Sequence, residues 1–221
     1  MKENFIQCLS PSGLHHMRYV EWGARDNPRI VICVHGLSRN CRDFDTLAQT
    51  LEKDFRVVCP DIVGRGKSDW LPNKAGYMNT QYVADIVTLI ARLTSEGPRE
   101  ILWVGTSMGG IIGMMLAALP NNPFTRLVLN DVGGVVPKAA LVRIVTYLGK
   151  DPRFKNYQEL EALVRLISAP FGPLTDAQWE HLTRHNATHY ADGTWGFNYD
   201  PGIAEPFKGV DIQRSEEHTS E

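Results

Sequence analysis

The sequence predicts an α/β fold in which a mostly parallel sheet carries helices on both faces. Four apolar runs, rich in Val, Ile and Leu, do not alternate with polar residues, which is typical of strands covered on both faces. They are Ile30–Val34, Phe55–Cys59, Ile101–Val104 and Leu127–Leu129. Helical patterns separate most of these runs, and strands that alternate with helices indicate a parallel sheet.

Three segments between the runs have helical periodicity. Residues 44–51 and 83–93 place apolar side chains at i, i+3, i+4 and i+7, as one face of an amphipathic helix does. Ile111–Leu119 is a densely apolar helix that stops at Pro120. Before the first run, a weaker pattern over Phe5–Trp22 predicts an antiparallel hairpin.

The pattern changes after Leu129, where three helices follow with no strand between them. Thr175 and Gln178 match a capping box at the start of the third helix. Consecutive helices inserted after a strand indicate a cap over a site. We therefore expect a core over residues 1–136, a helical cap over 137–195 and a return toward the core over 196–213. The three helices are Lys138–Leu148, Gln158–Ile167 and Asp176–Ala187.

The predicted sheet is unfinished, because no further βα unit follows the cap. A βαβ unit takes about 30 residues, so we expect roughly 60 residues to be missing after Gln213. Residues 214–221 fit no element and read like a translated sequencing adapter, which makes them a non-native tail. A natural polar C-terminus is the alternative.

Composition excludes several classes of function. A net charge of −2 and a pI of about 6.4 leave no basic stripe for nucleic acid and no cationic helix for a membrane surface. The N-terminus lacks the apolar stretch of a secretory signal. The four cysteines, Cys8, Cys33, Cys41 and Cys59, form no metal-binding pair, so we expect a cytoplasmic protein without disulfides or zinc.

The strongest chemical motif is Gly105-Thr106-Ser107-Met108-Gly109, which lies between a predicted strand and a predicted helix. A sharp strand-to-helix turn exposes the serine hydroxyl, and Gly105 and Gly109 let neighbouring backbone pass closely. The helix that follows points its positive end at a developing oxyanion. An ordinary glycine-rich turn is the alternative, but the flanking strand, the helix and the extra Gly110 favour a nucleophile.

A second motif, His35-Gly36-Leu37, ends the first central strand. A turn here aims the backbone N–H of Leu37 at the same point as the N–H of Met108, and two such donors form an oxyanion hole. His35 is either the general base or a structural residue that braces this loop. We favour the structural role, because in this arrangement the base follows the serine in the chain.

A third motif, Asp61-Ile62-Val63-Gly64-Arg65-Gly66-Lys67-Ser68, nearly matches a phosphate-binding loop. That loop needs a glycine at the place of Asp61 and a helix directly after it. Trp70, Leu71 and Pro72 follow instead. We therefore interpret this segment as a tight loop packed beside the active site.

Together these three motifs, in this order and spacing, resemble the α/β-hydrolase superfamily, in the branch with esterases, C–C bond hydrolases and serine haloperoxidases. The resemblance covers about residues 5–210 and implies that Ser107 attacks an acyl carbon to form a covalent intermediate, with no metal or organic cofactor. Dehalogenases and epoxide hydrolases of this fold have aspartate at the elbow, and Ser107 argues against both.

The chain departs from that family in its triad. The family places its acid and its histidine after later strands, which are absent here. Asp131 is a candidate acid, although a loop residue at the sheet edge is the favoured interpretation. The remaining histidines, His181, His185 and His189 in the cap and His218 in the tail, are weak candidates for the base. We therefore expect little turnover from this chain, and an unprotected sheet edge at Leu127–Leu129.

The leading functional hypothesis is hydrolysis of a carboxylic ester or related acyl bond in a small apolar substrate. A non-catalytic ligand-binding protein on the same fold is the alternative, and a histidine further along the gene would discriminate between them. The expected partner is a small molecule, with neither nucleic acid nor membrane. The oligomeric state stays open.

Overall fold

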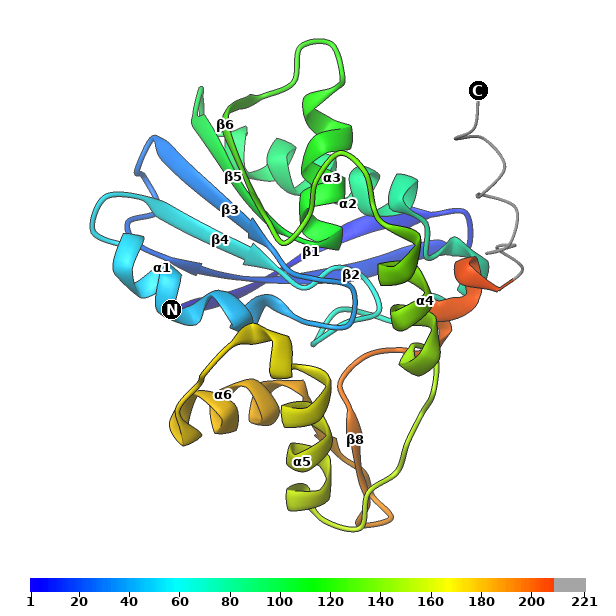
Figure 1. The fold of residues 1–221 in the computed structure, drawn as a ribbon. Coiled ribbons are helices and arrows are strands. Elements are labelled where there is room, and N and C mark those ends of the chain that lie inside the picture. The colour runs from blue at the N-terminus through cyan, green and yellow to red at the C-terminus, as the bar shows by residue number, and fades with distance from the viewer. Residues whose placement is uncertain (209–221) are drawn as a thin grey trace, which may run out of the picture.

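A computed structural model describes residues 1–208 and shows a six-stranded sheet in the order β1-β2-β4-β3-β5-β6 (Figure 1). The four central and outer strands β4, β3, β5 and β6 pair in parallel, and the β1–β2 hairpin joins them antiparallel through β4. The predicted α/β fold is therefore confirmed. The strands are β1 (Lys2–Ser10), β2 (Gly13–Trp22), β3 (Arg29–Val34), β4 (Arg56–Pro60), β5 (Glu100–Thr106) and β6 (Phe124–Asn130).

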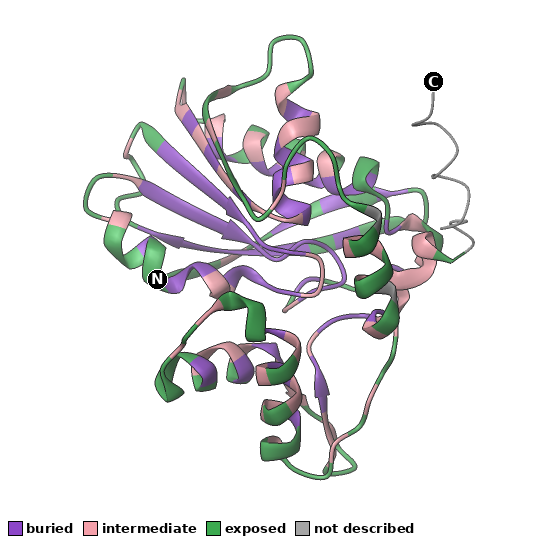
Figure 2. Cartoon of the chain, viewed as in Figure 1, coloured by how far each residue is buried: buried purple, intermediate pink, exposed green. Residues whose placement is uncertain are grey.

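Two hydrophobic cores, one on each face of the sheet, explain why the sequences of the central strands are unbroken apolar runs. In β3, Ile30, Ile32 and Val34 point into the core under helices α2 (Asn79–Thr94) and α3 (Met108–Ala117). The alternate residues Val31 and Cys33 fill the core under η1 (Cys41–Phe44) and α1 (Asp45–Leu51). Figure 2 shows the central strands β3 and β4 buried along nearly their whole length.

The outer strand β6 departs from this pattern. Among the described residues it pairs only with β5, and most of its residues are exposed, including Val128 and Leu129. Coverage on both faces, which the unbroken apolar run indicated, is thus wrong within residues 1–208, whereas the expected unprotected sheet edge at Leu127–Leu129 is confirmed there. An edge strand has one neighbour, so less of the protein is available to cover it.

Three helices follow β6, at the positions that their periodicity predicts. They are α4 (Lys138–Tyr147), α5 (Tyr157–Ile167) and α6 (Asp176–Asn186), with η3 (Ala169–Phe171) between the last two. The capping box of Thr175 and Gln178 is present at the start of α6. The sequence did not indicate the short hairpin of β7 (Ala187–His189) and β8 (Trp195–Phe197) that comes next.

Helices α5 and α6 and the β7–β8 hairpin, residues 157–197, form a lobe that we call the helical lobe (Figure 1). It lies against the segment that follows the carboxyl end of β3, where the Asn40 side-chain amide donates to the His185 carbonyl over 2.9 Å. The chain then returns to the sheet, where the Gly66 N–H donates to the Asn198 carbonyl over 3.1 Å.

The return segment ends in η4 (Pro201–Phe207), which lies beside η2 (Lys74–Gly76). The predicted non-native tail over 214–221 and the end of the predicted return lie outside the described residues. Within residues 1–208, no helix has the length and apolar character required to cross a membrane.

Candidate active site

Ser107 occupies the turn between β5 and α3 in a strained backbone conformation. Its φ of 49° and ψ of −112° lie where residues other than glycine are rare. The Ser107 N–H donates to the Asn130 carbonyl at the end of β6, and its own carbonyl accepts from the N–H groups of Gly110 and Ile111. The turn is thereby fixed by the neighbouring strand and by the first turn of α3.

The glycines of this turn allow neighbouring backbone segments to come closer than any residue with a Cβ would permit. A Cβ on Gly109 would lie 2.0 Å from the Val34 carbonyl oxygen at the tip of β3, and a Cβ on Gly105 would lie 2.4 Å from the Gly109 carbonyl oxygen. The elbow is therefore packed directly on the end of the first central strand. Such approaches are the physical reason why the motif needs glycine at these two positions.

The loop after β3 lies beside the serine. A Cβ on Gly36 would lie 3.7 Å from the Ser107 Cβ, so the backbone of Gly36 and Leu37 borders the hydroxyl. The Leu37 N–H makes no hydrogen bond to another residue within 1–208. Met108 is the first residue of α3, and an N–H at this position has no partner inside its helix. Both predicted donors thus belong to segments at the serine.

Ser107 itself is partly exposed, and its hydroxyl makes no hydrogen bond within residues 1–208. A nucleophile must be reachable by substrate, and partial exposure at the carboxyl end of a central strand meets that need.

His35 is fully buried and braces two loops. Its Nε2 accepts from the Ile62 N–H over 3.0 Å, so the proton lies on Nδ1, which donates to the Gly36 carbonyl over 2.8 Å. Burial lowers the pKa of His35 to about 4. A neutral imidazole with both nitrogens engaged holds Gly36 in place and has no free lone pair for the serine, which fits the structural role.

Asp131 follows β6 directly and is exposed, with a φ of 54°. The Asn130 carbonyl, directly before Asp131, accepts from the Ser107 N–H, so the backbone at Asp131 follows a residue that contacts the elbow. Within residues 1–208, no histidine makes a hydrogen bond to Asp131. The structure therefore gives this carboxylate no partner in a triad among those residues.

The histidines of the helical lobe are engaged away from Ser107. His181 Nε2 donates to the Arg42 carbonyl over 3.0 Å, and His185 packs on His181 with ring centroids 4.6 Å apart. His189 packs on Trp195. These contacts attach α6 to the segment after β3 and stabilise the β7–β8 hairpin.

The loop over 61–69 is filled by its own acid. The buried Asp61 carboxylate accepts from the backbone N–H groups of Cys41 and Lys67, and it pairs with Arg18 over 3.0 Å. No helix begins at Ser68 or Asp69. A phosphate would need those N–H groups and that space, so the loop is a structural support rather than a phosphate site.

One residue of this loop was missed by the sequence interpretation. Arg65 is fully buried and contacts both Leu37 and Met108. A charged residue between the two glycines Gly64 and Gly66 was the available signal. The sequence could not say which way the guanidinium points.

Two clusters contain side chains of metal-ligating types, but each acid in them already has a partner. In the buried cluster of Cys8, His15 and Asp85, the Asp85 carboxylate lies 3.1 Å from His15 Nε2 and accepts from the Gln81 amide. In the cluster of Asp45, His181 and His185, the guanidinium of Arg42 binds the Asp45 carboxylate. Both arrangements are explained without a metal.

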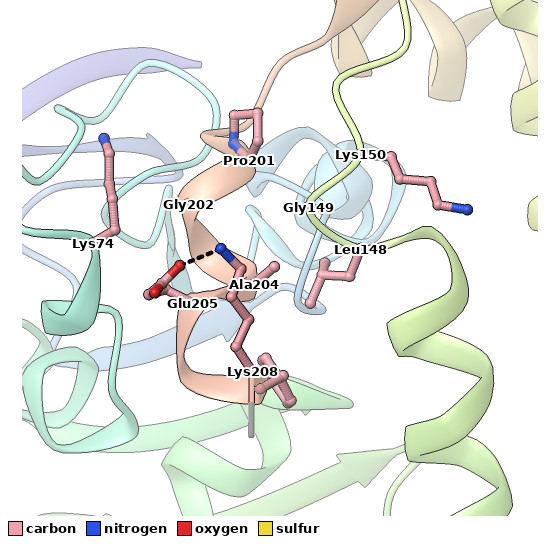
Figure 3. Close-up of a pocket in the computed structure, with 10 residues that line it drawn as sticks. Lys74, Leu148, Gly149, Lys150, Pro201, Gly202, Ala204, Glu205 and Lys208 are labelled. Atoms are coloured by element: carbon pink, nitrogen blue, oxygen red, sulfur yellow. Dashed lines mark ion pairs between the residues drawn. The ribbon is translucent and has the colours of Figure 1, made fainter. Parts of the chain in front are cut away.

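A cleft of about 510 Å³ lies between the end of α4 and η4 and does not include Ser107 (Figure 3). Leu148 and Phe207 form apolar wall, while Lys74, Lys150 and Lys208 stand around it. Its wall ends at Lys208, the last described residue. No residue of the Ser107 turn lines this cleft.

Comparison with known proteins agrees with this geometry. The family described as alpha/beta hydrolase fold matches residues 29–150, which include β3 to β6 and the elbow. The chain belongs to the α/β-hydrolase family. It is 51% identical over 207 residues to a 3-hydroxybutyrate-oligomer hydrolase from Cupriavidus necator, covering 92% of this chain and 70% of that protein.

Other proteins named as hydrolases are similar to a shorter stretch of this sequence or to its fold. A serine hydrolase-like protein from Danio rerio is 34% identical over 116 residues, 52% of this chain and 34% of the relative. The crystal structure of an α/β hydrolase from Novosphingobium aromaticivorans superposes with a TM-score of 0.79 at 33% identity, covering 93% of this chain and 70% of that one. The names of these relatives support a hydrolase activity for this α/β-hydrolase.

Proposed function

We propose that this protein is a serine hydrolase that cleaves a carboxylic ester through an acyl-enzyme on Ser107. The observation that carries the proposal is the strained turn of Ser107, with its partly exposed hydroxyl beside the backbone of Gly36 and Leu37. A strained serine between a strand and a helix is typical of a nucleophile elbow. An ordinary turn does not require strain at this position, because an unstrained residue would form it at lower cost.

The proposed reaction has two steps. The Ser107 Oγ attacks the ester carbonyl carbon and loses its proton to a general base, while the N–H groups of Leu37 and Met108 donate to the oxyanion. The C–O bond to the alcohol then breaks, the alcohol leaves with a proton, and the acyl group stays on Ser107. Water attacks this acyl-enzyme in the same way, which releases the carboxylic acid and restores the serine.

The proposed substrate is a short oligomer of a 3-hydroxy acid such as 3-hydroxybutyrate. The support is the 51% identity to the Cupriavidus necator hydrolase, whose name states that substrate. The ester bonds in such an oligomer join small, fairly apolar units, in agreement with the substrate class expected from the sequence.

The general base is the part of the proposal that residues 1–208 do not supply. His35 has both ring nitrogens engaged, and the other described histidines contact residues away from Ser107. We propose that a histidine outside the described residues completes the triad, and that its acid is either Asp131 or a residue beyond them.

A fluorophosphonate probe tests the nucleophile, because it reacts covalently with activated serines. We expect adduct formation at Ser107, located by peptide mass spectrometry, and none in Ser107→Ala. A C-terminally extended form that contains the proposed histidine should react far faster than this chain, and should hydrolyse 3-hydroxybutyrate dimer and trimer. Labelling at another residue, or equal labelling of Ser107→Ala, contradicts the serine mechanism.

A second candidate is a non-catalytic ligand-binding protein on the same fold. It is favoured by one observation, the absence of any hydrogen bond between Ser107 and a histidine within residues 1–208. If the extended form binds 3-hydroxybutyrate oligomers in calorimetry yet releases no monomer over hours, this second candidate replaces the first.

A further inference from the structure

Arg65 is fully buried and contacts both segments of the proposed oxyanion hole, with its guanidinium directed at four residues. Its Nε donates to the Leu37 carbonyl over 2.8 Å, and one terminal nitrogen lies 3.6 Å from the Met108 sulfur. The other terminal nitrogen donates to the Val63 carbonyl over 2.8 Å and to the Tyr82 hydroxyl over 2.9 Å. One planar group thus joins the loop after β3, the elbow helix and α2.

The two residues that Arg65 ties together are those whose N–H groups would bind the oxyanion. A hydrogen bond to the Leu37 carbonyl restricts rotation of the peptide plane that follows Leu37, and contact with the Met108 side chain fixes the first residue of α3. An oxyanion hole works because its donors need no reorganisation during the reaction. A shared anchor for both donor residues provides that preorganisation.

Arg65 also carries a buried charge with no carboxylate partner among the described residues. Among residues 1–208, none of the ion pairs includes Arg65, whereas the buried Arg18 pairs with Asp61 and the buried Arg56 pairs with Glu21. The rings of Tyr82 and Tyr77 face its guanidinium at 4.9 and 5.7 Å, which stabilises a cation in part. Burial of an unpaired charge costs free energy, which negative charge formed nearby would offset.

We propose that Arg65 is a positioning residue for the oxyanion hole of this protein. It fixes the geometry of the two donor segments, and its positive charge favours the negative tetrahedral intermediate over the neutral ester. This inference rests on the proposed serine hydrolase function. It predicts that loss of Arg65 impairs the chemical step and leaves binding of the uncharged ground state unchanged.

A purely structural role is the competing explanation, because Arg65 also supports its own loop. Residue 65 pairs with Tyr199, and the adjacent Gly66 N–H donates to Asn198, so the loop is attached to the chain that returns from the helical lobe. A structural residue would affect stability without a selective effect on the reaction rate. The test therefore needs a second buried arginine as its control.

Arg56 is that control. It is buried, donates through Nε and a terminal nitrogen to the Glu21 carboxylate, and stands at the start of β4, at the opposite end of the strands from Ser107. We would compare wild type with Arg65→Lys, Arg65→Met, Arg56→Lys and Arg56→Met, with Ser107→Ala as the blank. Phosphonylation of Ser107 by a fluorophosphonate gives a maximal rate and a half-saturating probe concentration, and thermal unfolding gives stability.

We expect Arg65→Met to lower the maximal phosphonylation rate about 100-fold, the range seen when one oxyanion donor is lost. Arg65→Lys keeps the charge but cannot reach both Leu37 and Met108, so its rate should recover to about a tenth of wild type. The half-saturating concentration should stay constant in both. The Arg56 variants should lose thermal stability and keep the wild-type rate.

Two other results are informative. Wild-type rates in folded Arg65→Lys and Arg65→Met, with stability losses like those of the Arg56 variants, overturn the inference and leave the proposed function intact. Equal labelling of wild type and Ser107→Ala overturns the proposed function itself. If neither Arg65 variant folds, Tyr82→Phe removes one anchor of the guanidinium, and an unchanged phosphonylation rate in that variant overturns the inference, whereas a loss of about threefold supports it.

Discussion

At the scale of single residues, the site depends on contacts between neighbours in the chain and on contacts between distant residues. Only the contacts between neighbours could be predicted from the sequence. Ser107, Gly105 and Gly109 form a local pattern, because an elbow is made within five consecutive residues. The role of Arg65 depends on Tyr82 and Met108, which are 17 and 43 positions away in the chain. Nothing in the local sequence fixes such distant contacts, so the sequence indicated the loop but not the direction of its guanidinium.

The strain at Ser107 gives a prediction about stability. A φ of 49° with a ψ of −112° costs a serine about 1–3 kcal/mol and a glycine little. Glycine loses about 0.5–1 kcal/mol more conformational entropy on folding, which is the smaller effect. We expect the free energy of unfolding of Ser107→Gly to exceed that of Ser107→Ala by about 1 kcal/mol. The dependence of this free energy on urea concentration should be equal in both, so Ser107→Gly should unfold at the higher urea concentration. An order reversed between the two variants would show that the turn is not strained.

Close packing at Gly109 gives a second prediction. A Cβ there would meet the Val34 carbonyl oxygen at 2.0 Å, and backbone cannot rotate away as a side chain can. We expect Gly109→Ala to lose about 1–3 kcal/mol of its free energy of unfolding through overpacking. The same variant should lose labelling of Ser107 by the fluorophosphonate. Gly133→Ala is the matched control, because a Cβ on Gly133 meets nothing within 4 Å. Equal urea midpoints for the two variants would contradict the close approach.

At the scale of elements, periodicity identified most strands and helices because each has a face to bury. The run Ile30–Val34 is apolar throughout because its two faces fill two cores. The β7–β8 hairpin escaped the same method. Strands of three residues, such as Ala187–His189, are too short to show a period, and their partner lies across a turn.

The attachment of α6 to the segment after β3 should depend on pH. Burial first, and then the charge of Arg42, lower the pKa of His185 to about 4, against about 6.5 for a histidine in an unfolded chain. The attached state therefore binds fewer protons than the detached one between these values. Attachment is fully stable above pH 6.5 and weakens as the pH falls toward 4.

Hydrogen exchange measures this effect. After correction for the intrinsic rate, we expect α6 amides to exchange about fivefold faster at pH 5 than at pH 7, a modest factor because His185 is only half-buried. His185→Gln should remove most of the pH effect, while His189→Gln, which loses only the contact with Trp195, should keep it. Amides of α2 serve as the internal reference for global unfolding. An equal pH response in both variants would rule out His185 as the titrating group.

At the scale of the whole molecule, the sheet is covered unevenly. Its central strands lie between two cores, whereas β6 pairs only with β5 within residues 1–208 and leaves Val128 54% exposed. The apolar run that marks this strand could not reveal the difference, because burial depends on the neighbours that the whole sheet provides. The run alone predicted the strand but not its exposure, whereas the lack of a predicted strand after it correctly indicated an unprotected edge within residues 1–208.

This uneven coverage predicts that the chain self-associates through β6. An apolar edge strand offers unpaired backbone groups to another copy, and a charge on that edge opposes pairing. We expect Val128→Lys to lower the rate of aggregation at 37 °C, followed by light scattering, with little change in the urea midpoint. Val87→Lys is the control, since Val87 is 48% exposed but lies on α2, where the backbone is already bonded within the helix. If both lysines slow aggregation equally, net charge is the cause, and the edge of β6 has no special part in it.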